Sequence, residues 1–209
     1  MFKDVIAVTN RSLSPRPFLE QIRIICSLGP KALILREKDL EETDYEDLAR
    51  EVIQLCQEYR VDCILHTFTG AAVRLRARRI HLPLPLFEEL SGTPVLNRFE
   101  AVGTSVHSVE DAAKACRLGA DYLTAGHIYA TDCKKGAPPR GVGFLKQVCE
   151  ASTVPVYAIG GIKPEPEMIR SVLECGAAGA CVMSGMMRYE PEATWPQGGT
   201  GSEKSPRIF

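Results

Sequence analysis

Short apolar segments alternate with longer amphipathic segments along most of the chain, and this alternation is the feature that most limits the possible folds. The short runs are almost entirely apolar instead of alternating apolar with polar residues, which suits parallel strands buried on both faces. Eight runs of this kind are found. They are Val5–Thr9, Ala32–Arg36, Cys63–His66, Ile80–Leu82, Val102–Val106, Asp121–Ala125, Val154–Ile159 and Gly179–Met183.

The segments between these runs carry apolar residues at helical spacing and helix-start signals. Thr43 is expected to cap a helix over Asp44–Tyr59, with Glu46 completing a capping box. Ser108 is expected to cap the helix that ends near Leu118. Eight strand-then-helix units that close on themselves predict an α/β protein with a single (β/α)8 TIM barrel, with an open doubly wound sheet as the competing fold.

The 209 residues fit one domain of this kind. We expect the barrel to occupy residues 1–188, with no good candidate for an eighth helix after Met187. Residues 189–209 are rich in Pro, Gly and Ser and are predicted to be a flexible tail, which contains the single Trp195.

Composition excludes several kinds of partner. The 25 basic and 26 acidic residues nearly cancel and form no long block of one sign, so no nucleic-acid partner is expected. No apolar run approaches the roughly 20 residues that span a bilayer, so no membrane partner is expected either. The eight cysteines form no CxxC pair, and the N-terminus does not resemble a secretory signal, so free thiols in the cytoplasm are predicted. The sequence leaves the oligomeric state open, and a homodimer is compatible with it.

Two glycine-containing turns predict a phosphate site. Gly160 and Gly161 follow the seventh strand, and Ser184 and Gly185 follow the eighth. In barrels of this type the loops after the last two strands commonly hold a phosphate through backbone N–H groups. Two tight turns without a ligand are the alternative interpretation.

Other polar residues come directly after successive strands, where barrel enzymes keep their functional groups. The substrate-binding candidates are Arg36, Lys38, His66, Ser105 and Lys134. In the loop after the sixth strand, His127 is the candidate acid or base, because an imidazole titrates near neutral pH.

An ordered set of motifs resembles the thiamine-phosphate synthase/TenI superfamily over about residues 5 to 187. The superfamily fold is a (β/α)8 barrel, in agreement with the strand count. The matching segments are Val8–Arg11, Leu35–Asp39, Gly103–Ser108, Ala120–Tyr122, Thr131–Gly136, Ala158–Ile162 and Val182–Gly185.

The resemblance implies one of two activities. The synthase joins a phosphorylated thiazole to a pyrimidine pyrophosphate with magnesium held by carboxylates after the third and fourth strands. Here the matching positions are His66-Thr67 and Leu82–Pro85, so both carboxylates are missing. The loop from Gly126 to Gly136 instead matches the TenI branch, whose members are thiazole tautomerases.

We therefore expect an isomerase of thiamine biosynthesis that aromatises a thiazole carboxylate phosphate by moving a proton, with His127 as acid/base. Such a reaction requires no metal and no redox cofactor, so none is predicted. The alternatives are a magnesium-dependent thiamine-phosphate synthase and a non-catalytic TenI-like protein that binds a phosphorylated metabolite.

Overall fold

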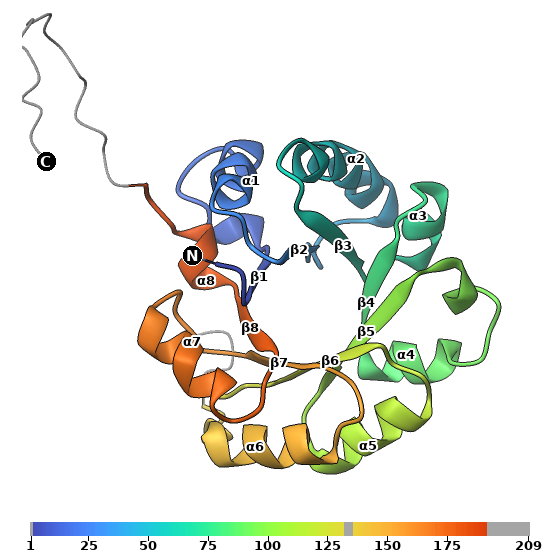
Figure 1. The fold of residues 1–209 in the computed structure, drawn as a ribbon. Helices are drawn as coiled ribbons and strands as arrows, with labels where there is room; N and C mark the ends of the chain where they lie inside the picture. The colour runs from blue at the N-terminus through green and yellow to red at the C-terminus, as the bar shows by residue number, and fades with distance from the viewer. Residues whose placement is uncertain (1, 132–135, 192–209) are drawn as a thin grey trace, which may run out of the picture.

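Eight parallel strands form a closed barrel in the order of the sequence, because β1 pairs with both β2 and β8 (Figure 1). The structure is a computed structural model that describes residues 2–131 and 136–191. The strands are β1 (Val5–Val8), β2 (Ala32–Leu35), β3 (Asp62–His66), β4 (Arg79–Pro83), β5 (Ala101–Val106), β6 (Tyr122–Gly126), β7 (Val156–Ile159) and β8 (Gly179–Val182). The predicted (β/α)8 barrel is confirmed.

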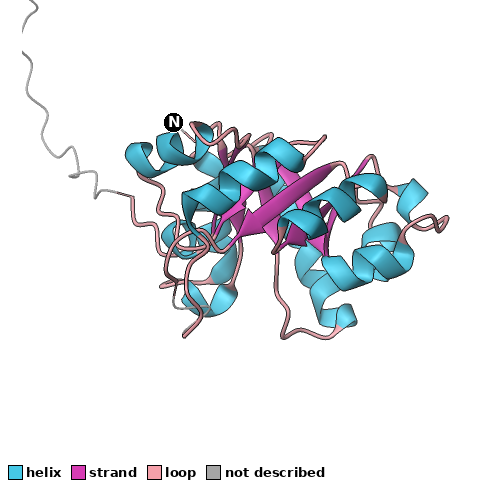
Figure 2. Cartoon of the chain, turned by 90° about the horizontal axis from the view of Figure 1, so that it is seen from below, coloured by secondary structure: helices cyan, strands magenta, loops and turns pink. Residues whose placement is uncertain are grey.

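A helix follows each strand and packs on the outside of the barrel (Figures 1 and 2). The helices are α1 (Phe18–Ser27), α2 (Glu42–Glu58), α3 (Thr69–Arg74), α4 (Leu84–Leu90), α5 (Val109–Arg117), α6 (Gly141–Ala151), α7 (Pro166–Leu173) and α8 (Ser184–Met187).

Alternate residues of each strand face two separate apolar cores. On β1, Val5 and Ala7 pack outward against the helices, whereas Ile6 and Val8 point into the barrel. The inner core is the smaller of the two, and Tyr122 and Tyr157 fill much of it, with their rings edge to face at 6.0 Å. This division explains why the strands read as continuous apolar runs.

Two helix starts test the capping signals. Ser108 caps α5 as predicted, accepting a hydrogen bond of 2.9 Å from the N–H of Asp111. The prediction of a capping box at Thr43 and Glu46 is wrong, because α2 already begins at Glu42 and has no side-chain cap. The carboxylate of Glu42 instead accepts from the N–H of Ala71 at 2.7 Å, which ties α2 to α3.

The chain closes the barrel with a single helical turn, α8, where no eighth helix was expected. Met186 and Met187 are buried there, so the turn seals the outer core beside α1. The packing continues to Tyr189, whose carbonyl accepts from Gln21 at 3.1 Å and whose ring lies 6.4 Å from that of Phe2. Residues 192–209 of the predicted tail, including Trp195, lie outside the described residues.

In the described ranges, no helix combines the length and apolar character that crossing a membrane requires. The seven cysteines described there are all free thiols, as predicted.

The interior of the barrel predicts a strict requirement for glycine at position 103. Gly103 is paired in register with Tyr122, and a Cβ at this position would overlap the tyrosine ring. We expect Gly103→Ala to lower the free energy of unfolding by about 2 kcal/mol or more, because the ring has no room to move. Urea unfolding measures the effect.

Gly143 provides the matched control, because it lies in α6 with open space around its Cβ position. Gly143→Ala should be neutral or stabilise the protein by about 0.5–1 kcal/mol through its better helix propensity. Equal stability of the two variants would contradict the close packing of Tyr122 on Gly103.

Candidate active site at the carboxyl ends of the strands

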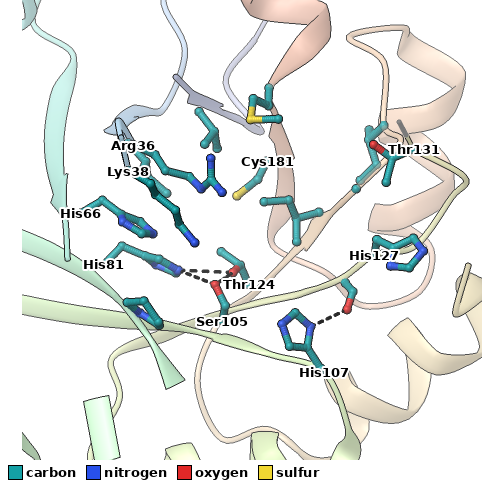
Figure 3. Close-up of a pocket in the computed structure, with 18 of the residues that line it drawn as sticks. Arg36, Lys38, His66, His81, Ser105, His107, Thr124, His127, Thr131 and Cys181 are labelled. Carbon is teal, nitrogen blue, oxygen red and sulfur yellow. Dashed lines mark hydrogen bonds between the residues drawn. The ribbon is translucent and has the colours of Figure 1, made fainter. Parts of the chain in front are cut away.

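A cavity of about 320 Å³ opens at the carboxyl ends of the strands (Figure 3). All four histidines of the chain line it. The structure brings together most of the predicted site residues in its wall. These are Arg36, Lys38, His66, Ser105, His127, Gly160, Gly161 and Ser184.

Two predicted site residues are not among the described residues of this wall. Gly185 lies in α8, where Pro164 occupies the space beside its Cα, so it is not a lining residue. Lys134 falls in residues 132–135, outside the described part of the chain.

Sequence reasoning missed His81 as a site residue. His81 stands in the middle of β4 and faces inward beside His66, its neighbour in register on β3. Ser105 and Thr124 occupy inward positions on the next two strands and are also paired in register. The alternation of side chains along a barrel strand could have identified His81. Every second residue of such a strand faces the interior, and a polar residue at one of these positions near the strand end faces the site.

His81 is held by hydrogen bonds on both ring nitrogens. Its Nδ1 lies 3.1 Å from the hydroxyl of Tyr122, and its Nε2 lies 2.9 Å from the hydroxyl of Ser105 (Figure 3). Thr124 donates to the same Ser105 oxygen at 3.0 Å. Burial lowers the pKa of His81 to about 3, and the positive charges of Arg36 and Lys38 act in the same direction.

His66 is a second neutral imidazole beside His81. The two rings are stacked, with centroids 5.7 Å apart, and the hydroxyl of Thr67 lies 2.6 Å from Nδ1 of His66. Burial lowers the pKa of His66 to about 2, assisted by His81, Arg36 and Lys38. A neutral imidazole offers one hydrogen-bond donor and one acceptor, so this pair can orient a polar ring without adding charge.

Arg36 and Lys38 project from a backbone segment that is fixed from below by a buried carboxylate. Glu37 is 2% exposed and accepts from the hydroxyl of Thr9 at 2.6 Å and from the N–H of Arg11 at 2.9 Å. The Thr9 hydroxyl in turn accepts from the N–H of Arg36 at 2.9 Å. Desolvation raises the pKa of Glu37, against the opposing effect of these donors. These bonds hold Glu37 away from the pocket. Arg36 and Lys38, on either side of it in the sequence, face into the pocket (Figure 3).

The glycine pair after β7 allows the loop after β6 to cross closely over it. Gly160 and Gly161 have φ of 98° and 70°, and a Cβ on either would overlap the segment that contains His127 and Tyr129. The N–H of Tyr129 donates to the carbonyl of Gly160 at 3.0 Å. Loop packing therefore requires these glycines, and both also line the pocket.

His127 is 7% exposed, and its Nε2 lies 3.4 Å from the carbonyl oxygen of Ala137. His107, on the neighbouring strand end, has its Nδ1 at 2.8 Å from the carbonyl oxygen of Gly126. Both rings reach the side of the pocket opposite His66 and His81 in the view of Figure 3.

The described wall of the pocket offers no carboxylate that could hold a magnesium ion. Its described lining contains no Asp and no Glu. Within residues 2–131 and 136–191, no three His, Cys, Asp or Glu side chains are grouped so that they could hold a metal. At the positions where the synthase resemblance implies carboxylates, the wall presents His66, Pro83 and Pro85.

A closed parallel barrel whose basic and imidazole groups gather at the carboxyl ends of its strands has the architecture of a barrel enzyme. Residues 5–186 match the family model described as thiamine monophosphate synthase, and the chain belongs to this family.

Known relatives carry the synthase name. The chain is 36% identical to the putative thiamine-phosphate synthase 2 of Aquifex aeolicus, over 75% of this chain and 83% of that protein. It is 31% identical to thiamine-phosphate synthase 2 of Streptococcus pneumoniae TIGR4, over 88% and 87% of the two chains. The solved structure of thiamine phosphate pyrophosphorylase from Pyrococcus furiosus is similar, with a TM-score of 0.76, 29% identity and coverage of 90% and 88%.

These relatives contradict the prediction of a thiazole tautomerase and favour its transferase alternative. The prediction depended on two missing carboxylates and on the loop around His127. Overall similarity to synthases extends over most of the chain, whereas residues 132–135 of that loop are not described.

The two buried histidines predict a stability that declines in acid. The folded protein keeps both rings neutral, whereas the unfolded chain protonates them below the ordinary pKa of 6.5. The free energy of unfolding should therefore fall as the pH drops below that value and continue to fall until about pH 3. At about pH 5 the loss should be on the order of 2 kcal/mol for each ring.

Urea unfolding at several pH values measures this dependence. His66→Asn is the matched variant, because an amide can still bond the Thr67 hydroxyl but does not titrate. Its stability should depend on pH about half as steeply in this range. An unchanged slope would show that His66 is not held neutral.

Proposed function

We propose that this protein is a transferase of thiamine biosynthesis that joins a phosphorylated thiazole to a pyrimidine pyrophosphate. The observation that carries the proposal is the similarity to proteins named thiamine-phosphate synthase over most of both chains, together with a pocket that retains basic residues at the strand ends. The proposed catalytic unit is the barrel of residues 1–188, acting in the cytoplasm.

The pocket has the size and lining for small phosphorylated rings. A cavity of about 320 Å³ is within the range of small-molecule sites, and most of its surface is apolar, from residues such as Val8, Ile34 and Met183. Apolar walls favour the flat faces of heterocycles, whereas polar groups at a few points fix their orientation.

Two groups of residues could hold the anionic parts of the substrates. Gly160, Gly161 and Ser184 follow β7 and β8, where barrels commonly bind a phosphate. Arg36 and Lys38 follow β2 and supply positive charge. We assign the thiazole phosphate to the glycine loops and the pyrophosphate to the two basic residues.

Joining the two substrates releases pyrophosphate, so the site must stabilise negative charge that develops on the leaving group. Fixed cations in a site that excludes water stabilise such charge more strongly than water does. His81 and Ser105, oriented by Tyr122 and Thr124, provide neutral hydrogen-bonding groups that could position a ring for the reaction.

The purified protein should form thiamine phosphate from the two substrates, detected by chromatography against a control without protein. Arg36→Gln keeps most of the side-chain length but removes the charge, and we expect it to lower kcat/KM by about 10–100-fold. Arg23→Gln makes the same change at an exposed position of α1 and should leave kcat/KM within about twofold of wild type.

Absence of product, tested both with magnesium and with EDTA, would overturn the proposal. Binding of thiazole phosphate without any product would favour the non-catalytic role that the superfamily resemblance also implies.

A further inference from the structure

Inside the barrel, two side chains from β4 and β6 meet across the strand that lies between them. His81 on β4 and Tyr122 on β6 are each paired in register with Gly103 on β5. Because Gly103 has no side chain, the two rings meet over it, with centroids 5.5 Å apart. The ring carbon that bears the Tyr122 hydroxyl lies closest to the place where a Cβ of residue 103 would be. The hydroxyl is thus directed past β5 toward His81.

We infer that Tyr122 is a positioning residue that gives the hydrogen-bond chain from the core to the pocket a single direction. In this chain Tyr122 donates to His81, His81 donates to Ser105, and Ser105 keeps a proton to donate to the ligand. The ligand must therefore place a hydrogen-bond acceptor, such as a phosphate oxygen or an unprotonated ring nitrogen, against Ser105. The inference rests on the proposed function only for the use of Ser105 by the substrates.

The direction begins at the phenol of Tyr122. Its oxygen lies 3.1 Å from Nδ1 of His81, and within residues 2–131 and 136–191 it forms no other hydrogen bond. Desolvation holds the pKa of this phenol well above its ordinary value, so the proton stays on the oxygen. A buried O–H group without an acceptor is strongly unfavourable, because it gives up its bond to water and gains none. The phenol therefore donates, and Nδ1 of His81 is the unprotonated nitrogen.

The bonds at the other ring nitrogen of His81 lead independently to the same result. Thr124 donates its only hydroxyl proton to Ser105 at 3.0 Å. The Thr124 oxygen lies 3.4 Å from Nε2 of His81, and it can face that nitrogen only as an acceptor. An acceptor beside Nε2 requires a proton on Nε2. Because the pKa of His81 is about 3, the ring is neutral near pH 7 and carries this proton alone.

Ser105 is the acceptor in both of its bonds to described residues. Nε2 of His81 donates to its oxygen at 2.9 Å, and Thr124 donates at 3.0 Å (Figure 3). A hydroxyl oxygen has two lone pairs and one proton, so these two bonds occupy the lone pairs and leave the proton for an acceptor in the pocket. With the proton of His81 on Nδ1 instead, Ser105 would donate to Nε2 and could offer the ligand no proton.

Nitrogen NMR of the full-length 15N-labelled protein, without substrate and at neutral pH, tests the direction of the chain. The protein has four histidines, and single variants of the other three identify the signals of His81 by elimination. We expect the proton of His81 on Nε2 and none on Nδ1. A proton on Nδ1 would overturn the inference.

Two tyrosine variants test the source of this direction. Tyr122→Phe removes the donor but keeps a ring over Gly103, so the Nδ1 resonance of His81 should move toward that of a nitrogen without a hydrogen bond. Tyr157→Phe is the matched control, because its ring packs edge to face on Tyr122 in the inner core, whereas both ring nitrogens of His81 are bonded to other residues. The control should leave the resonance unchanged. An unchanged Nδ1 resonance in Tyr122→Phe would count against the inference.

A double-mutant cycle tests whether Tyr122 acts on the reaction through Ser105. Tyr122→Phe and Ser105→Ala should each lower kcat/KM for thiamine phosphate formation by about tenfold. The double variant should be no slower than Ser105→Ala alone, because the two residues belong to one chain. Tyr157→Phe should stay within about twofold of wild type. Two losses that multiply in the double variant would show that Tyr122 does not act through Ser105.

The two kinds of measurement separate this inference from the proposed function. The NMR experiment needs no substrate, so absence of thiamine phosphate formation would reject the transferase while the proton on His81 still decides the inference. Thiamine phosphate formation by a protein whose His81 carries its proton on Nδ1 would support the transferase and reject the inference.

Discussion

Closure of eight parallel strands into a barrel forces alternate side chains of each strand into a narrow interior, and the rest of the structure follows from this constraint. At the amino-terminal side the interior is filled by Ile6, Ile64 and the rings of Tyr122 and Tyr157, so it is packed core. Nearer the carboxyl ends the same inward rows carry His66, His81, Ser105 and Thr124. The site therefore continues the inner core toward the carboxyl ends of the strands. Its side chains are held in fixed positions because they project from the barrel strands.

Tyr122 links the two levels. The ring of Tyr122 lies in the inner core at the amino-terminal side of the barrel, and its hydroxyl lies 3.1 Å from Nδ1 of His81 in the site. Burial keeps the pKa of this hydroxyl well above its ordinary value, so it remains protonated and bonds the neutral ring. The orientation of His81, and through it that of Ser105, therefore depends on the packing of the barrel interior against Gly103.

Much of the fold could be predicted from the sequence because its signals are local. Apolar runs mark each strand, and Ser108 caps its helix with its own side chain. The start of α2 could not be predicted in this way, because Glu42 bonds to α3, which comes later in the chain. Similarly, the apolar run Ile80–Leu82 marked β4 as buried but did not show that His81 faces the pocket. That fact depends on barrel closure and register.

The sequence predicted which candidate residues would lie close together, but the reaction that it predicted was wrong. Arg36, Lys38 and His66 do lie together, because the ends of neighbouring parallel strands meet at one edge. The choice of tautomerase failed because a missing ligand type says what a pocket does not hold, but it does not specify the bond that is made or broken. The overall similarity to synthases favours the transferase alternative instead.

The neutral histidines and the two cations that line one pocket are aspects of the same electrostatic arrangement. Arg36 and Lys38 help to keep His66 and His81 unprotonated, and the neutral rings in turn add no repulsion that would expel the two cations from the pocket. An anion bound at Arg36 and Lys38 would reduce their effect on both rings and raise the pKa of each. Ligand binding and histidine protonation are therefore coupled with positive sign, so that an anion and a proton favour each other in this site. The hydroxyl of Thr67 holds His66, and the hydroxyl of Tyr122 holds His81. Each bond can persist when its ring is protonated, because an imidazolium can donate to the hydroxyl oxygen.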